Sequence, residues 1–350
     1  PDIQFEGIGG KLMMSEGIKS WYPLEKLSVM GLVEVLKHLP ELLRIRKDLA
    51  KRWLNNPPDV FIGVDAPDFN LGLETKLKQA GIPTVHYVCP TIWAWRENRV
   101  KKIKKAVSLV LSIFPFEVPL LAKHGINSHY AGHPLAQALK QIPDQKHSRD
   151  QLGLDSDGIV LGLLPGSRMS EVTRLTDDFL AAAEIIKNKI PGLQVIAPMA
   201  TPAIHQYVVS RLAECSIDNI QLVDGRSREV MAASDILLTA SGTATLEIML
   251  YKKPMVVAYK VHWLSHFIFI KLGLLKTRFY AMPNILAGKS VVPELMQAEC
   301  TPQNLADAVL NLINDELQVK SIHAEFETMH NELAKGSIDT AAEAVLSLLP

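Results

Sequence analysis

The sequence has few of the features that mark a secreted or membrane-spanning protein. Its 350 residues include three cysteines, Cys89, Cys215 and Cys300, which lie far apart and form no CxxC pair. Such cysteines are typical of reduced thiols in a cytosolic protein and provide neither a disulfide framework nor a zinc site. No apolar run reaches the roughly 18–20 residues that cross a bilayer. The nearest, residues 262–275, is short and contains Lys271.

The chain also lacks an excess of either charge. Lys plus Arg and Asp plus Glu number 37 each, which argues against nucleic acid as a partner. Hydrophobic residues make up 48% of the sequence, enough for a sizeable core, and the length predicts about two domains.

Short apolar runs alternate with amphipathic stretches, which predicts parallel sheets covered by helices. A polar segment at residues 136–158 interrupts this alternation and is typical of a linker, and the pattern after residue 301 is wholly helical. We therefore predict an α/β protein with two Rossmann-like, doubly wound domains at residues 1–150 and 151–325, and a helical tail at 326–350. Ligands should bind where the strands end. The expected strands lie at residues 59–65, 83–88, 107–114, 126–132, 158–168, 193–199, 220–225, 235–242 and 254–260.

Two turns have the composition of phosphate sites. In the first, an apolar strand ends at Leu164 and is followed by Gly166, Ser167 and Arg168 before a helix begins. A glycine turn at a helix start exposes backbone N–H groups, and the arginine adds a planar donor fork suited to a diphosphate. The alternative is an ordinary strand–helix loop with a solvated arginine.

The second turn follows the strand that ends near Ala240. Its backbone and hydroxyl groups face a helix start in the same way, and Glu247 on that helix is placed to accept ribose hydroxyls. A plain helix-capping role for the serine or threonine is the alternative. Neither turn matches GxxxxGK[ST] or GxGxxG, which disfavours a P-loop or dinucleotide fold. The residues of this turn are Ser241, Gly242, Thr243 and Ala244.

Other polar residues divide into catalytic and structural candidates. Asp65 closes an expected strand, where a carboxylate faces the ligand side and can act as a general base. Asp68 is explained more simply as a helix N-cap, and His86 as a core residue. No metal-ligand spacing and no GxSxG motif is present, so we expect no metal and no nucleophilic hydrolysis.

Residues 30–53 form an unusually apolar helix pattern flanked by basic residues. One interpretation is a helix packed on the sheet; the other is a helix lying in lipid headgroups. In both, Pro40 should break or bend the helix. A tryptophan-containing cationic segment at residues 89–106 also suits an anionic lipid surface, although such runs are usually solvated helix faces. The apolar surface comprises Val33, Val35, Leu36, Leu39, Leu42 and Leu43.

Together these motifs resemble one family, the lipid A disaccharide synthases. The matching segments keep the family's order and span nearly the whole chain. They are SVMGLVEVL (28–36), DVFIGVDAPDFN (59–70), HYVCPTIWAWR (86–96), LLPGSRMSEV (163–172), ASGTATLE (240–247) and MPNILAG (282–288).

The resemblance implies a GT-B fold, in which two Rossmann-like domains face a cleft and the C-terminal domain holds the nucleotide. It implies an inverting, metal-independent hexosyltransferase without a cofactor, which moves 2,3-diacylglucosamine from UDP-2,3-diacylglucosamine to 2,3-diacylglucosamine 1-phosphate. The products, in lipid A and lipopolysaccharide biosynthesis, are a β-1,6-linked disaccharide 1-phosphate and UDP. On this resemblance Asp65 is the general base and Arg168, with residues 241–244, stabilises the departing UDP. Glu247 and Asn284 become nucleotide or sugar contacts.

The resemblance also implies a position at the cytoplasmic face of the inner membrane, with a homodimer as one assembly to consider. This favours the lipid interpretation of residues 30–45. One departure is a first strand and glycine-rich turn that the family has before residues 3–7, so we expect the first sheet to lack a central strand. The alternatives are a UDP-N-acetylglucosamine 2-epimerase-like isomerase, another GT-B glycolipid transferase, or a catalytically silent scaffold on a membrane surface.

Overall fold

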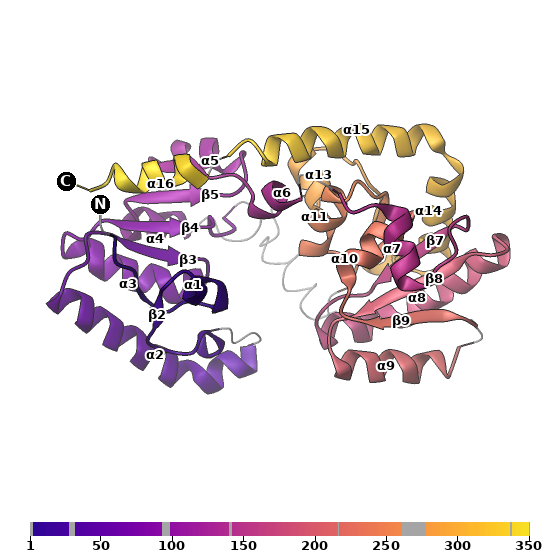
Figure 1. The fold of residues 1–350 in the computed structure, drawn as a ribbon, viewed down its shortest axis with the longest axis horizontal. Coiled ribbons are helices and arrows are strands. Elements are labelled where there is room, and N and C mark those ends of the chain that lie inside the picture. The colour runs from indigo at the N-terminus through magenta and orange to yellow at the C-terminus, as the bar shows by residue number, and fades with distance from the viewer. Residues whose placement is uncertain are drawn as a thin grey trace.

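The computed structural model describes residues 3–27, 32–92, 99–139, 142–215, 217–260, 278–336 and 338–349. Figure 1 shows two α/β lobes side by side, joined near α6 (Pro134–Ala138) and at the C-terminal end of α15 (Glu316–Leu333). Residues 93–98 of the cationic segment 89–106, and the whole apolar run at 262–275, lie outside the described residues.

The N-terminal lobe contains a parallel sheet in the order β3-β4-β5-β6. Each strand lies within the run predicted for it. A helix connects each strand to the next, so that neighbouring strands are parallel. A short parallel pair, β1 with β2, precedes it. The elements are β1 (Glu6–Gly7), α1 (Lys11–Ser15), β2 (Lys19–Ser20), η1 (Leu24–Lys26), α2 (Leu32–Asn55), β3 (Phe61–Val64), α3 (Pro67–Gln79), β4 (Thr84–Tyr87), α4 (Arg99–Ala106), β5 (Leu109–Ser112), α5 (Glu117–Lys123) and β6 (Ser128–Tyr130).

Helix α2 continues through Pro40, so of the break or bend predicted at this residue, the break is wrong. A proline inside a helix removes one N–H donor and crowds the preceding turn. Packing offsets that cost, because Ile45, Leu49 and Trp53 are buried against the lobe in the turns that follow.

The C-terminal lobe contains a six-stranded parallel sheet in the order β12-β11-β10-β7-β8-β9. Its two central strands, β7 and β10, are buried along their whole length, which explains their continuous apolar sequences. The elements are α7 (Gln145–Leu152), β7 (Val160–Leu164), α8 (Met169–Lys189), β8 (Gln194–Met199), α9 (Pro202–Leu212), β9 (Ile220–Asp224), α10 (Ser227–Ala233), β10 (Ile236–Ala240), α11 (Thr243–Leu250), β11 (Met255–Tyr259), α13 (Met282–Ala287), β12 (Glu294–Met296), η2 (Gln297–Glu299) and α14 (Pro302–Asn314). The last helix, α16 (Ile338–Leu346), packs on the N-terminal lobe.

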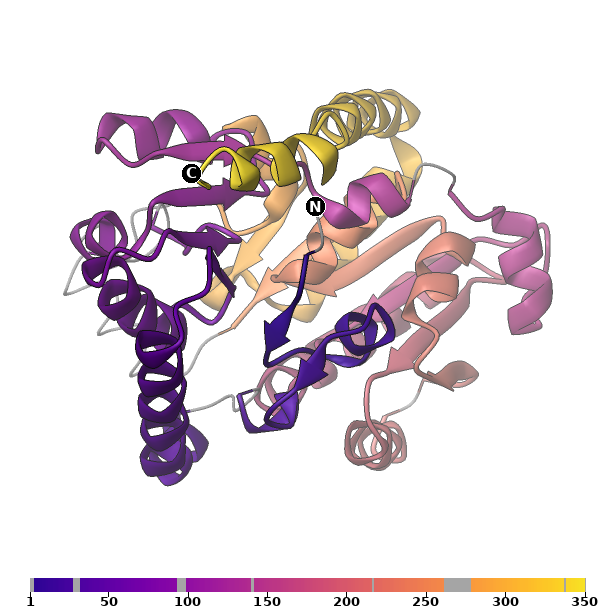
Figure 2. The same cartoon turned by 60° about the vertical axis from the view of Figure 1, so that its left-hand side comes forward.

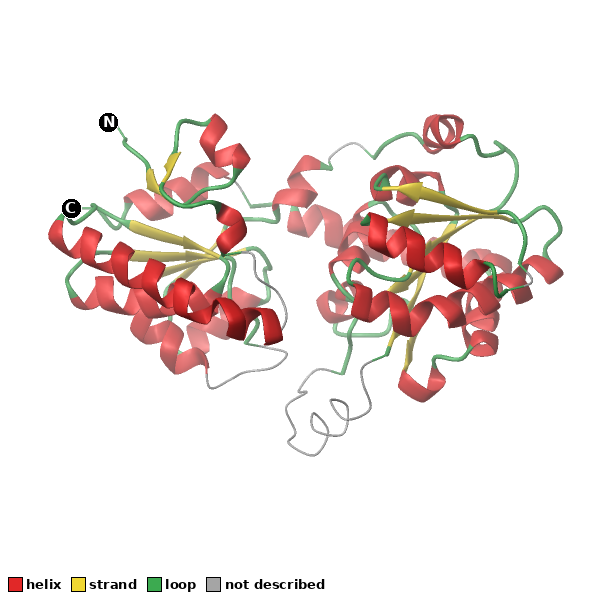
Figure 3. Ribbon diagram, turned by 90° about the horizontal axis from the view of Figure 1, so that it is seen from below, coloured by secondary structure: helices red, strands yellow, loops and turns green. Residues whose placement is uncertain are grey.

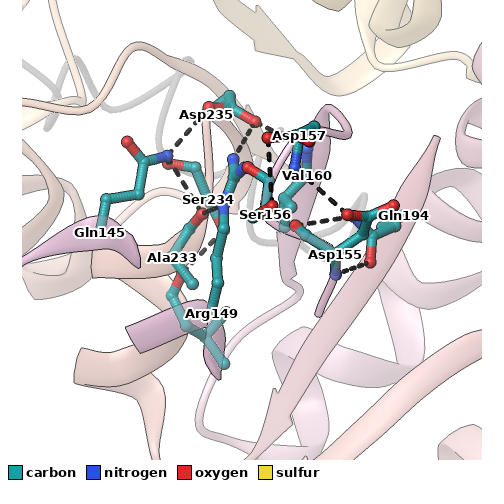
Figure 4. Close-up of polar contacts among 11 residues, drawn as sticks. Gln145, Arg149, Asp155, Ser156, Asp157, Val160, Gln194, Ala233, Ser234 and Asp235 are labelled. Atoms are coloured by element: carbon teal, nitrogen blue, oxygen red, sulfur yellow. Dashed lines mark hydrogen bonds and ion pairs between the residues drawn. The ribbon is translucent and has the colours of Figure 1, made fainter. Parts of the chain in front are cut away.

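Helix α7 belongs to the packing of the C-terminal lobe, although its sequence is polar. Nη2 of Arg149 lies 2.6 Å from Oδ2 of Asp235, and the same oxygen accepts the backbone N–H of Val160 at 2.7 Å. Gln145 donates to the other carboxylate oxygen at 2.9 Å, and Figure 4 shows these contacts within a larger polar network. The division predicted at residue 150 therefore falls inside a helix that contacts α10.

The chain returns to the N-terminal lobe at its end. Ala341 of α16 belongs to an apolar cluster with Val85 and Leu109, on the N-terminal sheet (Figure 1). The two connections between lobes touch: the N–H of His133 donates to the carbonyl of Leu333 at 2.9 Å. Gly132 and the residue opposite it, Gly336, are so close that a Cβ on the latter would lie 2.0 Å from backbone.

Candidate functional site

The two predicted phosphate turns lie next to each other at the centre of the C-terminal sheet. Strands β7 and β10 are paired in register from Ile236 opposite Leu161 to Thr239 opposite Leu164. From β7 the chain builds outward to β8 and β9, then returns to β10 and builds in the other direction. Such a reversal leaves a crevice at the carboxyl ends of the two strands, where doubly wound folds bind ligands.

The turn after β7 is shaped by a glycine. Gly166 has a φ of 130°, and a Cβ there would lie 2.7 Å from Cβ of Glu171. Helix α8 then begins at Met169 with no side-chain hydrogen bond capping it. Arg168 is 59% exposed, and its Nη1 lies 2.8 Å from Oε1 of Glu171. The turn thus offers backbone N–H groups and a guanidinium held at the helix start.

The turn after β10 is open in the same way. Helix α11 begins after Gly242, which has a φ of 153°, and no side chain caps it. The alternative of a capping serine or threonine is therefore wrong. Oγ of Ser241 instead donates to the carbonyl of Tyr280 at 2.9 Å. Oγ1 of Thr245 stabilises the turn: it donates to the carbonyl of Gly242 and accepts from the N–H of Met282.

Of the two other predicted ligand contacts, one is accessible and one is not. Glu247 is half-buried, and burial raises the pKa of its carboxyl while Arg228 opposes the shift. Asn284 has no exposed surface. Its amide donates to the carbonyl of Val292 and to Glu294, and its oxygen accepts two backbone N–H groups. In this geometry Asn284 supports the neighbouring loop and has no group left for a nucleotide.

In the N-terminal lobe, Asp65 follows β3 directly and is exposed. Asp65 and Ala66 have φ values of 49° and 42°, and Val88, after the adjacent strand β4, has a φ of 74°. Left-handed conformations cost energy for such residues and tend to persist at functional sites. Nδ2 of Asn70 stabilises the turn by donating to the carbonyl of Asp65 at 2.8 Å.

Asp68 does not cap helix α3, and that prediction is wrong. The N-cap position is Ala66. Asp68 is the second residue of the helix, and its carboxylate accepts from Nη2 of Arg99 at 2.8 Å. His86 is in the core as predicted, but sequence reasoning missed its partner, Glu74. A glutamate on a polar helix pattern gives no signal that it is buried.

Both sets of strand ends face the middle of the molecule. In Figures 1 and 3 the arrowheads of the N-terminal and C-terminal sheets point toward each other. Figure 2, a view rotated by 60°, shows the same two sheets with α2 along the outer side of the N-terminal lobe. Asp65 thus lies at the inner end of one sheet and Arg168 at the inner end of the other.

The predicted membrane residues are partly described. Leu39 and Leu43 are 39% and 45% exposed, and Leu42 is half-buried. The side chains of Val33, Val35 and Leu36 lie outside the described residues. Within the part that the structure describes, no helix has the length and apolar character to cross a membrane. Among those same residues, no group of three His, Cys, Asp or Glu side chains could hold a metal ion.

Comparison with known proteins assigns the family. The family model described as lipid-A-disaccharide synthetase matches residues 1–348. The chain belongs to this family. A lipid-A-disaccharide synthase of Xanthomonas campestris pv. campestris (strain 8004) is 47% identical over 351 residues, covering 100% of this chain and 80% of that protein. One from Alkalilimnicola ehrlichii is 45% identical, covering 99% of this chain and 91% of that protein.

Solved structures confirm the GT-B fold predicted from the family resemblance. UDP-GlcNAc 2-epimerase from Neisseria meningitidis, bound to UDP-GlcNAc, superposes with a TM-score of 0.64 over 98% of this chain and 99% of that one. A glycosyltransferase from Rickettsia africae gives 0.56 over 98% and 89%. Identities of 13% and 11% make these likenesses of fold alone. For a lipid-A-disaccharide synthetase family member, the turns at Arg168 and Ser241 are the candidate nucleotide site.

Proposed function

We propose that the chain transfers 2,3-diacylglucosamine from UDP-2,3-diacylglucosamine to 2,3-diacylglucosamine 1-phosphate. The observation that carries this is the pair of uncapped helix starts, α8 and α11, side by side at the reversal of the sheet in a chain matched by the family over residues 1–348. Two helix starts and one guanidinium suit a diphosphate.

The reaction follows from the groups at the two sheet ends. The carboxylate of Asp65 accepts the proton of the acceptor's 6-hydroxyl, and that oxygen attacks C1 of the donor sugar. The bond between C1 and the diphosphate oxygen breaks from the opposite face, which inverts the anomeric centre and leaves the electron pair on UDP. Arg168 and the N–H groups of residues 242–244 stabilise the developing negative charge. No metal ion or other cofactor takes part in the proposed reaction, and activity in excess EDTA tests this.

Membrane association and assembly are further parts of the proposal. Exposed Leu39 and Leu43 on the same stretch of α2, with exposed Arg44 and Lys47 beside them, form the kind of face that lies in a headgroup layer. We place the protein at the cytoplasmic face of the inner membrane, where its acylated substrates would be. Sedimentation in detergent tests the homodimer.

The deciding experiment is a radiolabel transfer assay in detergent with Asp65→Asn and the matched control Asp59→Asn. Asp59 is exposed at the opposite end of β3, so its amide variant removes the same charge away from the site. Loss of a general base should lower kcat by about 10²–10⁴, with the control near wild type. UDP binding without any disaccharide would remove the transferase assignment, and conversion of UDP-N-acetylglucosamine would then support the isomerase.

A further inference from the structure

Two tyrosines lie beside the candidate nucleotide site, and the proposed reaction does not use them. Tyr259 is the last residue of β11, and Tyr280 lies immediately before the N-cap of α13. Their rings are stacked, with 6.0 Å between centroids and an interplanar angle of 25°. Both residues are half-buried, and within the described part of the chain neither hydroxyl makes a hydrogen bond. This tyrosine pair therefore has ring surface and two hydroxyls available to a ligand.

Main-chain contacts connect the tyrosine pair to the turn after β10. Ala258 is paired in register with Ala240, and its carbonyl accepts the N–H of Ser241 at 2.9 Å. Tyr259, the next residue, therefore lies beside the start of the turn. Oγ of Ser241 donates to the carbonyl of Tyr280 at 2.9 Å. These contacts use backbone atoms of the β11 end and of Tyr280, so they do not occupy the tyrosine side chains.

The end of β11 also lies against the first half of helix α8. Nζ of Lys260, the residue after the strand, forms an ion pair with Asp178 of that helix. Glu171 and Arg174 precede Asp178 by seven and four residues, spacings that put all three on one side of the helix. Burial raises the pKa of the Tyr259 hydroxyl, Glu171 adds to the shift and Arg174 opposes it, so this hydroxyl lies near the same side of α8.

Helices α8 and α11 cover opposite faces of the sheet. The steps from β7 to β8 and from β10 to β11 run in opposite directions across it, and right-handed crossovers then place the two connecting helices on different faces. A diphosphate that contacts both helix starts thus has its two ends on different sides of the sheet. Glu247, the predicted ribose contact, is on α11, whereas the tyrosine pair lies beside α8. With the ribose at Glu247, the sugar end of the diphosphate is on the side of the tyrosines.

We propose that Tyr259 and Tyr280 form one side of the site that binds the transferred sugar of the UDP-sugar donor. The Tyr280 ring packs on the C–H groups of the pyranose, and the two hydroxyls form hydrogen bonds with its oxygen atoms. Apolar ring surface with a few polar groups that fix orientation is the usual composition of such a site. The inference rests on the proposed transfer from a UDP-linked sugar and adds residues that recognise the sugar.

The test compares the binding of UDP and of UDP-2,3-diacylglucosamine, in detergent and without the acceptor. Tyr280→Ala removes the ring, and Tyr280→Phe and Tyr259→Phe each remove one hydroxyl. The matched control is Tyr207→Ala, which truncates a half-buried tyrosine of the same lobe on α9, a helix that packs on β8 and β9. Circular dichroism and the melting temperature check that each variant is folded.

We expect Tyr280→Ala to weaken donor binding about tenfold, as truncation of a well-packed tyrosine in a binding site does, while the Kd of UDP stays within about twofold of wild type. Each phenylalanine variant should lose about threefold in donor affinity, the effect of one neutral hydrogen bond. Tyr207→Ala should bind both ligands as wild type does. In the transfer assay the losses should raise the KM for the donor and leave kcat nearly unchanged, because these contacts are made before and during the reaction alike.

Equal losses for UDP and the donor in Tyr280→Ala would show that the rings hold the nucleotide or the turn, and would overturn the inference. Unchanged donor binding in that variant would overturn it as well. Failure of the proposed function gives a different result. If wild type binds the donor more tightly than UDP, Tyr280→Ala loses that preference and no disaccharide forms, the sugar site remains and the transferase assignment fails. If disaccharide forms and every tyrosine variant keeps the wild-type KM, the transferase remains and the sugar site fails.

Discussion

Oε1 of Glu74 lies 2.7 Å from Nδ1 of His86, and neither side chain has any exposed surface. The pair joins helix α3 to strand β4 beneath the turn that carries Asp65. The second oxygen of Glu74 and Nε2 of His86 are buried without hydrogen-bond partners in the structure. Burial therefore raises the pKa of the glutamate, although the hydrogen bond with His86 opposes the shift.

This pair predicts a pH-dependent effect of Glu74→Gln on stability. Because the folded pKa exceeds the unfolded value of 4.5, the folded state binds the proton more tightly. Stability is then fully present below pH 4.5 and decreases as the pH rises toward the folded pKa, by about 1.4 kcal/mol for each pH unit that separates the two pKa values. Glutamine keeps a partner for His86 without the charge, so the variant should gain stability relative to wild type from pH 4.5 upward.

Guanidinium unfolding of both proteins between pH 4 and 8 measures this difference. Glu16→Gln, at an exposed position in the same lobe, is the matched control and should follow wild type throughout. A free-energy difference between Glu74→Gln and wild type that does not change with pH would contradict the assigned cause.

Gly63 should tolerate no side chain, because Glu74 occupies the space. A Cβ at Gly63 would lie 2.2 Å from Oε1 of Glu74 and 3.2 Å from Cβ of Asn70, the residue that holds the Asp65 turn. Gly63→Ala should therefore destabilise the protein by about 1–3 kcal/mol, as overpacking does, and lower the rate of transfer. Thermal unfolding and the transfer assay measure the two effects.

Gly72→Ala is the control for this substitution. Gly72 lies in α3, and a Cβ there meets only the end of the flexible Arg46 side chain, at 2.9 Å. Alanine in a helix is favoured over glycine by about 0.5–1 kcal/mol, so this variant should be as stable as wild type or more so. Equal losses from both substitutions would show that the contact with Glu74 is not the cause.

Much of the fold follows from local sequence pattern. The apolar runs that form β7 and β10 are buried on both faces, and such strands need no partner information to be recognised. The three residues of β12 lack a run of this kind, so the sequence pattern does not predict this strand. The polar composition of α7 predicts a linker. The sequence does not show that Arg149 in this helix is buried, because its partner lies 86 residues away.

The candidate site, like the fold, is only partly predictable from the sequence. The turns at Gly166 and Gly242 are visible in sequence because glycine, a preceding strand and a following helix are neighbours along the chain. That β7 and β10 lie side by side is a property of the whole sheet. Asn284 shows the limit of motif reasoning: its segment matches the family, yet its amide is used within its own loop.

Arg168 should be sensitive to the shape of its side chain as well as its charge. Its Nη1 is held 2.8 Å from Glu171 at the start of α8, which orients the guanidinium beside the turn. Arg168→Lys keeps the charge but loses the planar set of guanidinium donors, so kcat/KM should fall about 10²-fold. In Arg168→Ala, which loses both, kcat/KM should fall about 10³-fold. The transfer assay at subsaturating donor measures both.

The control for these two variants is Lys189→Gln at the other end of α8, where the side chain makes a surface ion pair with Asp307 at 3.6 Å. It removes a charge from the same helix and should leave kcat/KM unchanged. Wild-type kcat/KM in Arg168→Lys would show that a point charge is sufficient at this position.

From the surroundings of His133, on one of the two connections between the lobes, we predict that the protein loses stability in acid. The His133 ring is buried beside Phe114, 5.4 Å between centroids, and its Nδ1 accepts the N–H of Leu135. Burial lowers the pKa of the imidazole from 6.5 to about 4, so the folded state binds this proton less tightly than the unfolded chain. The stability that this side chain contributes is present above pH 6.5 and is lost as the pH falls toward 4, up to about 3 kcal/mol.

Glutamine at this position offers an acceptor for the same N–H and does not titrate. We therefore expect His133→Gln to show a flatter decline in unfolding free energy between pH 6.5 and 4 than wild type, measured by denaturant titration. His147→Gln, at an exposed position on α7, is the matched histidine control and should keep the wild-type slope. If His133→Gln also keeps that slope, protonation of another group causes the acid sensitivity, and the contact between Phe114 and His133 does not respond to pH.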